Sequence, residues 1–290
     1  MVAIKDLRIH EDTNRISKEL CREIIGWKHL SHPNILPLLG VSVSLDPDSF
    51  RILTRWMING NITEYARSNP EVNRLQLLFE VASGVAYLHK LGVVHGDLKG
   101  ANILVNDEGI ACLADFGLMT ILIENGTISL SATAVSSAGT VPWMSPELLS
   151  GKISKPTPQS DCYALGMVIY EVLTGLPPFH DLGKHAVTPA VQRGKRPKRP
   201  SKSKSLGFSN ALWKLVVRCL HKSPAARPTA QDLLQYLQRA SHTWTPPPVY
   251  PILERGVERD QTSDYELENK VKSARARCPS FSLSVLCCVL

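Results

Sequence analysis

The chain has 290 residues, 43% of them hydrophobic and 20% charged, which is the composition of an ordinary soluble globular protein with one large domain or two smaller lobes. No apolar run approaches the roughly 18 residues needed to cross a bilayer. The opening residues, MVAIKDLRIHEDTN, also lack the apolar core of a secretory signal. The seven cysteines show no CxxC metal spacing. Most fall within apolar segments, which fits reduced core thiols in an intracellular protein.

The first 57 residues have the pattern of a small, strand-rich unit that contains one helix. Val2 to Lys5 is predicted to be a strand that ends in a lysine. An apolar stripe over 13–30 predicts a helix, which the dipeptide His32-Pro33 would end. Two β-like runs follow, at 34–44 and 50–57.

From Asn59 to about residue 240 the pattern is mainly helical. Two short apolar runs lie between residues 93 and 120. After Ser241 a Pro-rich start and balanced charges predict a tail over 241–290 that is largely disordered or weakly docked. Helices with a core-facing apolar stripe are predicted at 74–91, 161–174, 210–221 and 229–240.

The formal net charge of +7 has a local origin. Seven positive residues and no acid lie between Arg193 and Lys204, a number equal to the whole excess. Such a cluster can bind phosphates, acidic substrates or a nuclear import receptor. Pro197 and Pro200 favour an exposed, solvated loop instead, and the lack of aromatic residues in the run argues against nucleic-acid binding.

The most informative stretch is His95-Gly96-Asp97-Leu98-Lys99-Gly100-Ala101-Asn102, which is followed by Asp115-Phe116-Gly117. Asp97 can orient a substrate hydroxyl and accept its proton. Asn102 and Asp115 offer the hard oxygen ligands that Mg²⁺ prefers. These two carboxylates and one amide therefore have spacings that suit phosphoryl transfer from a magnesium nucleotide.

These two motifs follow Val2-Ala3-Ile4-Lys5 and precede Ser145-Pro146-Glu147. Because the four motifs occur in this order, the chain resembles a protein kinase catalytic domain over about residues 1–240. The motifs HGDLKGAN (95–102) and WMSPE (143–147) resemble those of the tyrosine-kinase-like group, of the sort abundant in mushroom-forming fungi. Members of that group mostly phosphorylate serine and threonine. The resemblance implies an α+β, bilobal fold. Its parts would be a β-rich N-lobe over 1–57, a mainly helical C-lobe over 58–240 and the tail over 241–290.

The resemblance also implies roles for single residues. Lys5 would contact the α- and β-phosphates of ATP and be held by a glutamate, for which Glu23 is the better match and Glu19 the alternative. Asp97 would be the catalytic base, and Lys99 would point at the γ-phosphate, as in serine/threonine kinases.

The metal and adenine sites are implied in the same way. Asn102 and Asp115 would hold Mg²⁺. Thr54 matches the gatekeeper position, and the hinge behind the adenine would contain Trp56 and Met57.

Other residues match the family's scaffold. Glu147 would pair with Arg227, and Asp161 would brace the backbone of the catalytic loop. The arginine that usually receives an activating phosphate is replaced by Gly96, so we expect little dependence on phosphorylation of the activation segment. That segment carries seven candidate hydroxyls, of which Thr140 is expected to shape the substrate site instead: Thr127, Ser129, Ser131, Thr133, Ser136, Ser137 and Thr140.

The sequence begins one residue before Val2. A complete kinase small lobe has two strands and a glycine-rich loop before the lysine strand, so the N-lobe is expected to be truncated, with these parts absent. One interpretation is an incomplete or degenerate gene model of an active enzyme. The other is a pseudokinase or scaffold module with impaired or no catalysis.

Taken together, the sequence predicts an ATP- and Mg²⁺-dependent kinase that phosphorylates serine or threonine hydroxyls of protein substrates and binds no nucleic acid. The expected location is cytoplasmic. The terminal Cys287-Cys288-Val289-Leu290 fits the C-a-a-X pattern of geranylgeranylation, so membrane association is expected only if Cys287 is prenylated. The sequence holds no information on the substrate or the oligomeric state.

Overall fold

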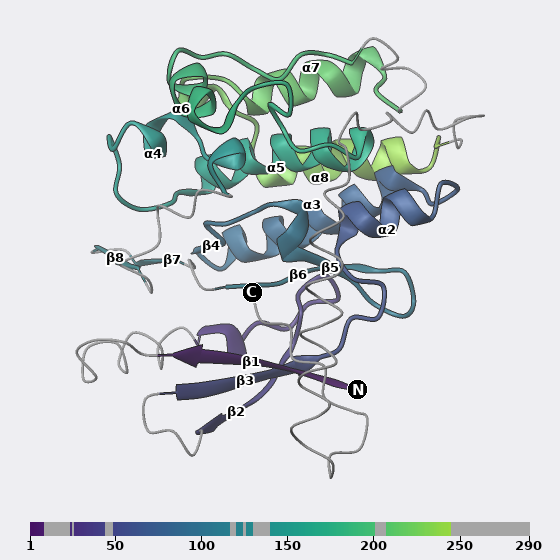
Figure 1. Cartoon of the computed structure of the whole chain (residues 1–290), viewed down its shortest axis with the longest axis vertical. Coiled ribbons are helices and arrows are strands. Elements are labelled where there is room, and N and C mark those ends of the chain that lie inside the picture. The colour runs from purple at the N-terminus through teal and green to yellow at the C-terminus, as the bar shows by residue number, and fades with distance from the viewer. Residues whose placement is uncertain are drawn as a thin grey trace, which may run out of the picture.

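The computed structural model of the chain describes residues 1–8, 24, 26–43, 49–116, 120–123, 126–129, 140–200 and 207–244. A three-stranded sheet lies at one end of the molecule, and helices α4 to α8, within residues 146–241, lie at the other (Figure 1). Helices α2 (Ile62–Ser68) and α3 (Arg74–Lys90) lie between them with the short hairpin β5–β6 of residues 103–113. The α+β content predicted from the sequence is therefore confirmed.

The sheet consists of β1 (Val2–Arg8), β2 (Leu38–Val43) and β3 (Ser49–Arg55), in the order β1-β3-β2 with both pairs antiparallel. Ile52 in the central strand is buried and lies opposite Lys5 of β1. The run predicted over 34–44 is a strand only from Leu38 onward. Pro33 and Pro37 flank the preceding segment, which pairs instead with β6 through a bridge between Ile35 and Leu113.

The helix predicted over 13–30 falls largely outside the described residues, and 26–28 are helical at its end. Helix α2 (Ile62–Ser68) follows the sheet and precedes α3 (Arg74–Lys90). The α3 bounds confirm the predicted 74–91 to within one residue, because Asn73 caps its first turn and Gly92, at φ +70°, leads the chain out of it.

After α3 the chain alternates short strands and turns. The segments are β4 (Val93–Val94), the 3₁₀ turn η1 (Gly100–Asn102), β5 (Ile103–Val105), β6 (Ala111–Leu113), β7 (Thr120–Ile123), β8 (Gly126–Ser129) and the 3₁₀ turn η2 (Val141–Trp143). Strands β5 and β6 form an antiparallel hairpin, and β4, β7 and β8 form a separate small sheet.

Helix α5 (Pro158–Thr174) runs through the centre of the helical part, and nearly all its side chains are buried. It begins three residues before the predicted 161, because Thr157 and Ser160 form a reciprocal capping box. Gly175 ends it in the left-handed conformation, at φ +68°. The predicted helices at 210–221 and 229–240 are present as α7 (Asn210–Cys219) and α8 (Ala230–Ser241).

Two further helices in this part were not predicted individually, and a 3₁₀ turn follows α7. The segments are α4 (Pro146–Leu149), α6 (Lys184–Gln192) and η3 (Pro224–Ala226). Helix α6 contains Pro189, which weakens its sequence signal. The buried apolar side chains form one continuous core, from Ile52 of the sheet through Leu78 of α3 and Leu165 of α5 to Leu237 of α8.

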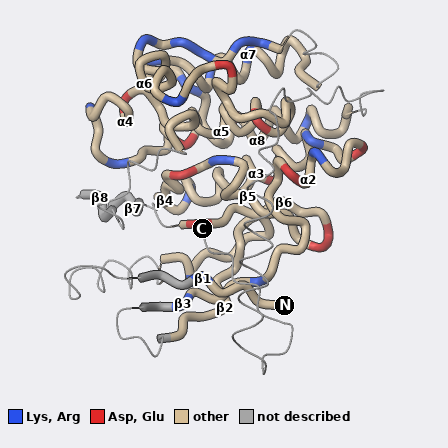
Figure 2. Tube along the Cα trace, viewed as in Figure 1, with Lys and Arg blue, Asp and Glu red and all other residues tan. Residues whose placement is uncertain are grey.

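Lysine and arginine are prominent around α6 and on the segment that leads from it towards α7 (Figure 2). The described part of the predicted basic loop is largely exposed. Lys198 pairs with Asp181 at 3.0 Å, and Arg199 donates to the side-chain oxygen of Asn210 at 2.9 Å. Within the described ranges, no helix has the length and hydropathy to cross a membrane.

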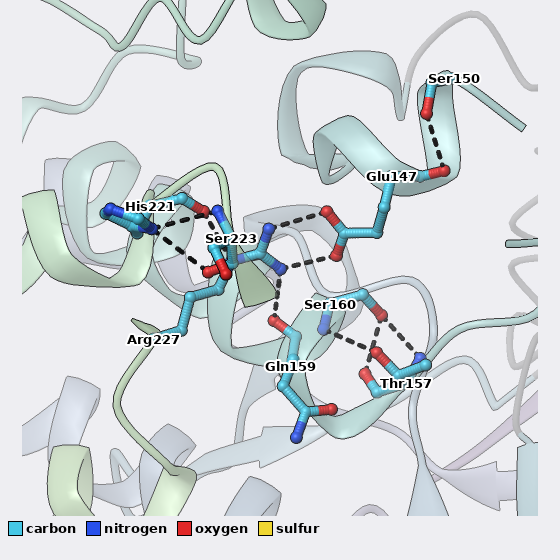
Figure 3. A network of polar contacts seen from close by, with 8 residues as sticks. All are labelled: Glu147, Ser150, Thr157, Gln159, Ser160, His221, Ser223 and Arg227. Carbon is cyan, nitrogen blue, oxygen red and sulfur yellow. Dashed lines mark hydrogen bonds and ion pairs between the residues drawn. The ribbon is translucent and has the colours of Figure 1, made fainter. Parts of the chain in front are cut away.

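A buried ion pair joins α4 to the segment before α8 (Figure 3). The guanidinium of Arg227 donates to both carboxylate oxygens of Glu147, at 2.6 and 2.7 Å, and also to the carbonyl of Gln159 at 2.9 Å. Burial opposes ionisation of Glu147, but the hydrogen bonds and charge of Arg227 outweigh it and hold the pKa of that carboxyl below its usual 4.5. The pair predicted from the sequence is therefore present, and it fastens α4 to the helical core.

We expect Arg227→Met to lower the free energy of unfolding by about 3–5 kcal/mol at neutral pH, because it leaves the Glu147 carboxylate buried without its partner. The Glu147 pKa is lowered in the folded state, so the contribution is complete above pH 4.5 and is lost as the pH falls through the folded value. Urea unfolding at neutral and acidic pH measures both effects.

Asp181→Asn is the matched control, since its ion pair with Lys198 is more exposed. It should cost at most about 1 kcal/mol. If Arg227→Met and Asp181→Asn lower the free energy of unfolding by equal amounts, the Glu147–Arg227 pair stabilises the fold no more than an exposed ion pair does.

Candidate active site

The loop after β4 is fixed from inside by His95, whose side chain is fully buried. Its Nδ1 accepts from the backbone N–H of Asp97 at 3.2 Å, and its Nε2 lies 3.0 Å from the carbonyl oxygen of Ala114. The tautomer with hydrogen on Nε2 satisfies both contacts. His95 therefore ties the loop of Asp97 to the segment that precedes Asp115.

The same loop is held from α5 by Asp161. This buried carboxylate accepts the backbone N–H groups of His95 at 2.9 Å and Gly96 at 3.0 Å, and the ring Nε2 of His89 lies 2.9 Å from it. Gly96 has φ +85°, a conformation that a residue with a side chain adopts at a cost. The bracing contact expected of Asp161 is present.

Asp97 lies at the centre of a polar cluster. Its Oδ2 accepts from Lys99 Nζ and from Asn102 Nδ2, each at 2.9 Å. Lys99 also donates to the hydroxyl of Thr140 at 3.0 Å, which joins the loop to turn η2. The other carboxylate oxygen of Asp97, Oδ1, is buried and has no hydrogen-bond partner among the described residues. An unsatisfied buried acceptor in a cluster of this kind suits a bound donor such as a hydroxyl.

Lys5 reaches this region from strand β1. Its Nζ lies 2.9 Å from Oδ1 of Asp115, although the two residues are 110 positions apart in the chain. Asp115 has φ +58°, a left-handed conformation that aspartate tolerates better than most residues and that is common where strain serves a site.

The next side chain, Phe116, is buried between two rings. Its centroid lies 5.1 Å from that of Trp27 and 5.2 Å from that of His95. Phe116 therefore connects the helical residues 26–28 to the loop of Asp97.

The gatekeeper and hinge candidates lie at the end of the sheet. Thr54 of β3 is half-buried and lies opposite Ala3 of β1. Trp56 follows the strand and donates its backbone N–H to the carbonyl of Met1 at 3.2 Å, while the side chain of Met57 is buried. Glu23 and its alternative Glu19 both fall outside the described residues.

One residue of this network was missed by the sequence analysis. Glu171 of α5 is buried and accepts hydrogen bonds from Gly100, in the loop of Asp97, and from Trp143 of η2. Burial raises its pKa, and these hydrogen bonds oppose the rise. The sequence feature that could have identified Glu171 is its place within the apolar run Val168–Leu173, because charged side chains are rarely buried without a partner.

The donor set fits a magnesium nucleotide. Mg²⁺ in such sites keeps one or two protein carboxylates or amides and takes its other ligands from phosphates and water. The amide nitrogen of Asn102 points at Asp97, which leaves its side-chain oxygen available to a metal, and Asp115 supplies a carboxylate. Among the described residues, no group of three or more His, Cys, Asp or Glu side chains could hold a metal by itself.

Comparison with known proteins agrees with this geometry. Residues 1–237 match the model of the protein tyrosine and serine/threonine kinase family. The chain is 32% identical over 238 residues to the cytokinesis protein sepH of Emericella nidulans and 35% identical over 225 residues to a probable serine/threonine-protein kinase of Dictyostelium discoideum. It is 28% identical over 243 residues to the serine/threonine-protein kinase STY17 of Arabidopsis thaliana.

These alignments cover 81%, 76% and 82% of the chain but 16%, 13% and 40% of the respective relatives. The chain thus spans less than half the length of each of these relatives, and the similarity lies in a region that includes the site. Since the family match covers most of the residues, including the loop of Asp97, Asp115 and the Lys5 strand, the chain belongs to the protein tyrosine and serine/threonine kinase family.

Proposed function

We propose that this chain transfers the γ-phosphate of ATP to serine or threonine hydroxyls of protein substrates. One observation carries the proposal: a buried carboxylate oxygen of Asp97 has no hydrogen-bond partner in the described structure, while the second oxygen is held by Lys99 and Asn102. The family membership and the names of the relatives support the same activity.

In this proposal Asp97 aligns the acceptor hydroxyl through its available oxygen. It takes the hydroxyl proton as the bond from the hydroxyl oxygen to the γ-phosphorus forms, while the bond from that phosphorus to the oxygen shared with the β-phosphate breaks and ADP leaves. Lys99 keeps the carboxylate in place and directs positive charge to the same region. Because the acceptor hydroxyl is aligned before the reaction, its positioning accounts for much of the lowering of the activation barrier.

The nucleotide would lie between β1, the hinge residues and Asp115. Lys5 would bind its phosphates, and Thr54, Trp56 and Met57 would line the adenine side, with Glu23 as the partner proposed for Lys5. Asn102 and Asp115 would hold Mg²⁺. When bound, the metal neutralises phosphate charge, which favours transfer.

The finer subfamily is also a proposal. The motifs resemble the tyrosine-kinase-like group, and the sheet β1–β3 is proposed to be part of a smaller lobe that lies over the helical part. The rival proposal is a pseudokinase or scaffold, in which the same residues bind nucleotide without transferring phosphate.

Asp97→Asn separates the two. The change preserves the shape and a hydrogen-bond acceptor but removes the proton acceptor, so phosphate transfer to a serine peptide should fall by about 10²- to 10⁴-fold. Nucleotide affinity, measured by calorimetry with Mg²⁺ and ATP, should remain unchanged because Asp97 is assigned to the acceptor side.

Phosphotransfer by the wild-type chain that survives in Asp97→Asn would contradict the role of Asp97. Nucleotide binding by a correctly folded wild type that transfers no phosphate would favour the scaffold.

Control by phosphorylation of the activation segment should be weak. Gly96 brings no guanidinium to the place where this family usually pairs a loop phosphate with arginine. Thr140 has a structural reason to be kept apart from the other six hydroxyls, because it accepts a hydrogen bond from Lys99.

We therefore expect a variant with six hydroxyl residues replaced by alanine to keep most of its phosphotransfer activity, provided that Thr140 is retained. The assay compares initial rates for the same peptide, with circular dichroism to confirm folding. Loss of activity in the folded variant would show that one of these hydroxyls controls the enzyme. The six are Thr127, Ser129, Ser131, Thr133, Ser136 and Ser137.

We further propose that the chain is cytoplasmic and is associated with membranes only if Cys287 carries a geranylgeranyl group. Residues 245–290 lie outside the described part of the chain, so this proposal depends on the terminal four residues alone. Mass spectrometry of the C-terminal peptide from a eukaryotic host should find the modified cysteine in wild type and not in Cys287→Ser. An unmodified wild-type terminus would end the membrane proposal.

A further inference from the structure

The positive charge of this protein is concentrated in one part of its surface. Residues 182–231 contain twelve lysines and arginines and no aspartate or glutamate, whereas the formal net charge of the whole chain is only +7. Arg227 is buried in its pair with Glu147. Figure 2 shows the basic residues around α6 and on the segment that leads from it towards α7. The exposed ones in the described structure are Lys184, Arg193, Lys195, Arg196, Lys198, Lys214, Arg218 and Lys222.

The segment 193–199 lies against the end of α7. Arg196 donates from its Nε to the carbonyl of Leu220, the C-cap residue of α7, at 3.3 Å. The side chain of Lys222 lies beside Gly194, since its Cδ is 4.0 Å from the position that a Cβ of Gly194 would occupy. We call residues 193–199 together with Lys222 the basic strip. Its two parts come from before and after α7, so the fold gathers these charges into one strip.

The tail begins beside one end of this strip. Arg199 donates to the carbonyl of Phe208 at 3.4 Å. The residue before Phe208 is Gly207, and a Cβ there would lie 2.6 Å from the ring of Trp244, so the two residues are in close contact. Trp244 is the last residue that the structure describes. The chain that follows it therefore starts close to Arg199.

The sequence of the tail carries the opposite charge within reach of the strip. Five acids and one arginine lie between Glu258 and Glu268, and Glu258 is 14 positions after Trp244. In the disordered tail that the composition predicts, a linker of this length has an r.m.s. end-to-end distance of about 20 Å. The residues 194–199 of the strip span at most about 18 Å. The linker can therefore place the acids on the strip without being fully extended.

We propose that residues 258–268, the acidic segment, bind to the basic strip of the same chain. The two carry opposite charges, which attract each other across an exposed surface. Because the linker length matches the span, the effective concentration of the segment is on the order of 1 mM, and a contact with a dissociation constant of about 0.2 mM keeps about five sixths of it bound. A free polyanion would need a similar concentration to compete. The inference goes beyond phosphate transfer and does not depend on it.

Proteolysis of the full chain measures this contact. Chymotrypsin cleaves after aromatic residues, and Tyr265 lies within the acidic segment. At low salt we expect cleavage after Tyr265 to be about sixfold slower in the full chain than in a synthetic peptide of residues 255–272, because only the unbound fraction is cleaved. High salt should bring the two rates together, since it screens exposed charges. Mass spectrometry follows the cleavage of this bond.

Charge reversal on each side identifies the contact. Lys195→Glu with Lys222→Glu changes the strip and leaves the tail sequence intact, so cleavage should approach the rate of the peptide. Asp260→Lys with Glu268→Lys changes the acidic segment and should have the same effect when it is compared with a peptide of its own sequence. Combining all four changes again places opposite charges across the contact and should restore part of the protection.

Lys28→Glu with Lys90→Glu is the matched control, because it makes the same change of charge at two exposed lysines outside residues 182–231. Its cleavage should stay at the wild-type rate, and circular dichroism confirms the folding of each variant. The inference is overturned if the wild-type chain is cleaved as fast as the peptide at low salt, or if the control loses as much protection as the strip variant. Protection that increases with protein concentration would place the segment on a second copy and would also overturn it.

Discussion

The loop that carries Asp97 depends on two buried carboxylates of helix α5. Asp161 accepts the N–H groups of His95 and Gly96, and Glu171 accepts that of Gly100. Because the two acids are ten residues apart on a regular helix, their Cα atoms are about 15 Å apart along its axis. A loop fastened at both ends to one rigid element has little freedom to move Asp97, which is what an aligned acceptor site requires.

Burying these carboxylates has a cost that backbone donors offset. Each charge would be strongly disfavoured in the interior without partners, and each has hydrogen bonds from the loop it holds. The glycines on either side of Asp97 serve different needs. Gly96 adopts a positive φ, and Gly100 admits the Glu171 carboxylate to its backbone.

The region of Lys5 and Asp115, the proposed nucleotide side, is connected to this loop by weaker and more varied contacts. The Lys5–Asp115 pair is partly exposed, so solvent reduces its contribution to stability. The aromatic contacts of Phe116 with Trp27 and His95 are buried and give this region its packing. Trp27 also donates its indole N–H to the carbonyl of Leu36 at 2.7 Å, which ties the end of the first helix to the segment before β2. The contacts of Lys5 and Asp115 therefore contribute less to stability than the buried contacts that hold the loop of Asp97.

The sequence by itself determined the family, the long helices α3, α5, α7 and α8 and the candidates Lys5, Asp97, Asn102 and Asp115, because apolar periodicity and motif spacing are local properties of the chain. The start of α5 was predicted three residues late, because the capping box of Thr157 and Ser160 places it at Pro158. Only the tertiary structure brought Lys5 to Asp115 and joined Gly100, Trp143 and Thr63 through Glu171. Those contacts depend on how packed elements approach one another in space, and no spacing along the polymer encodes the direction in which a buried side chain points.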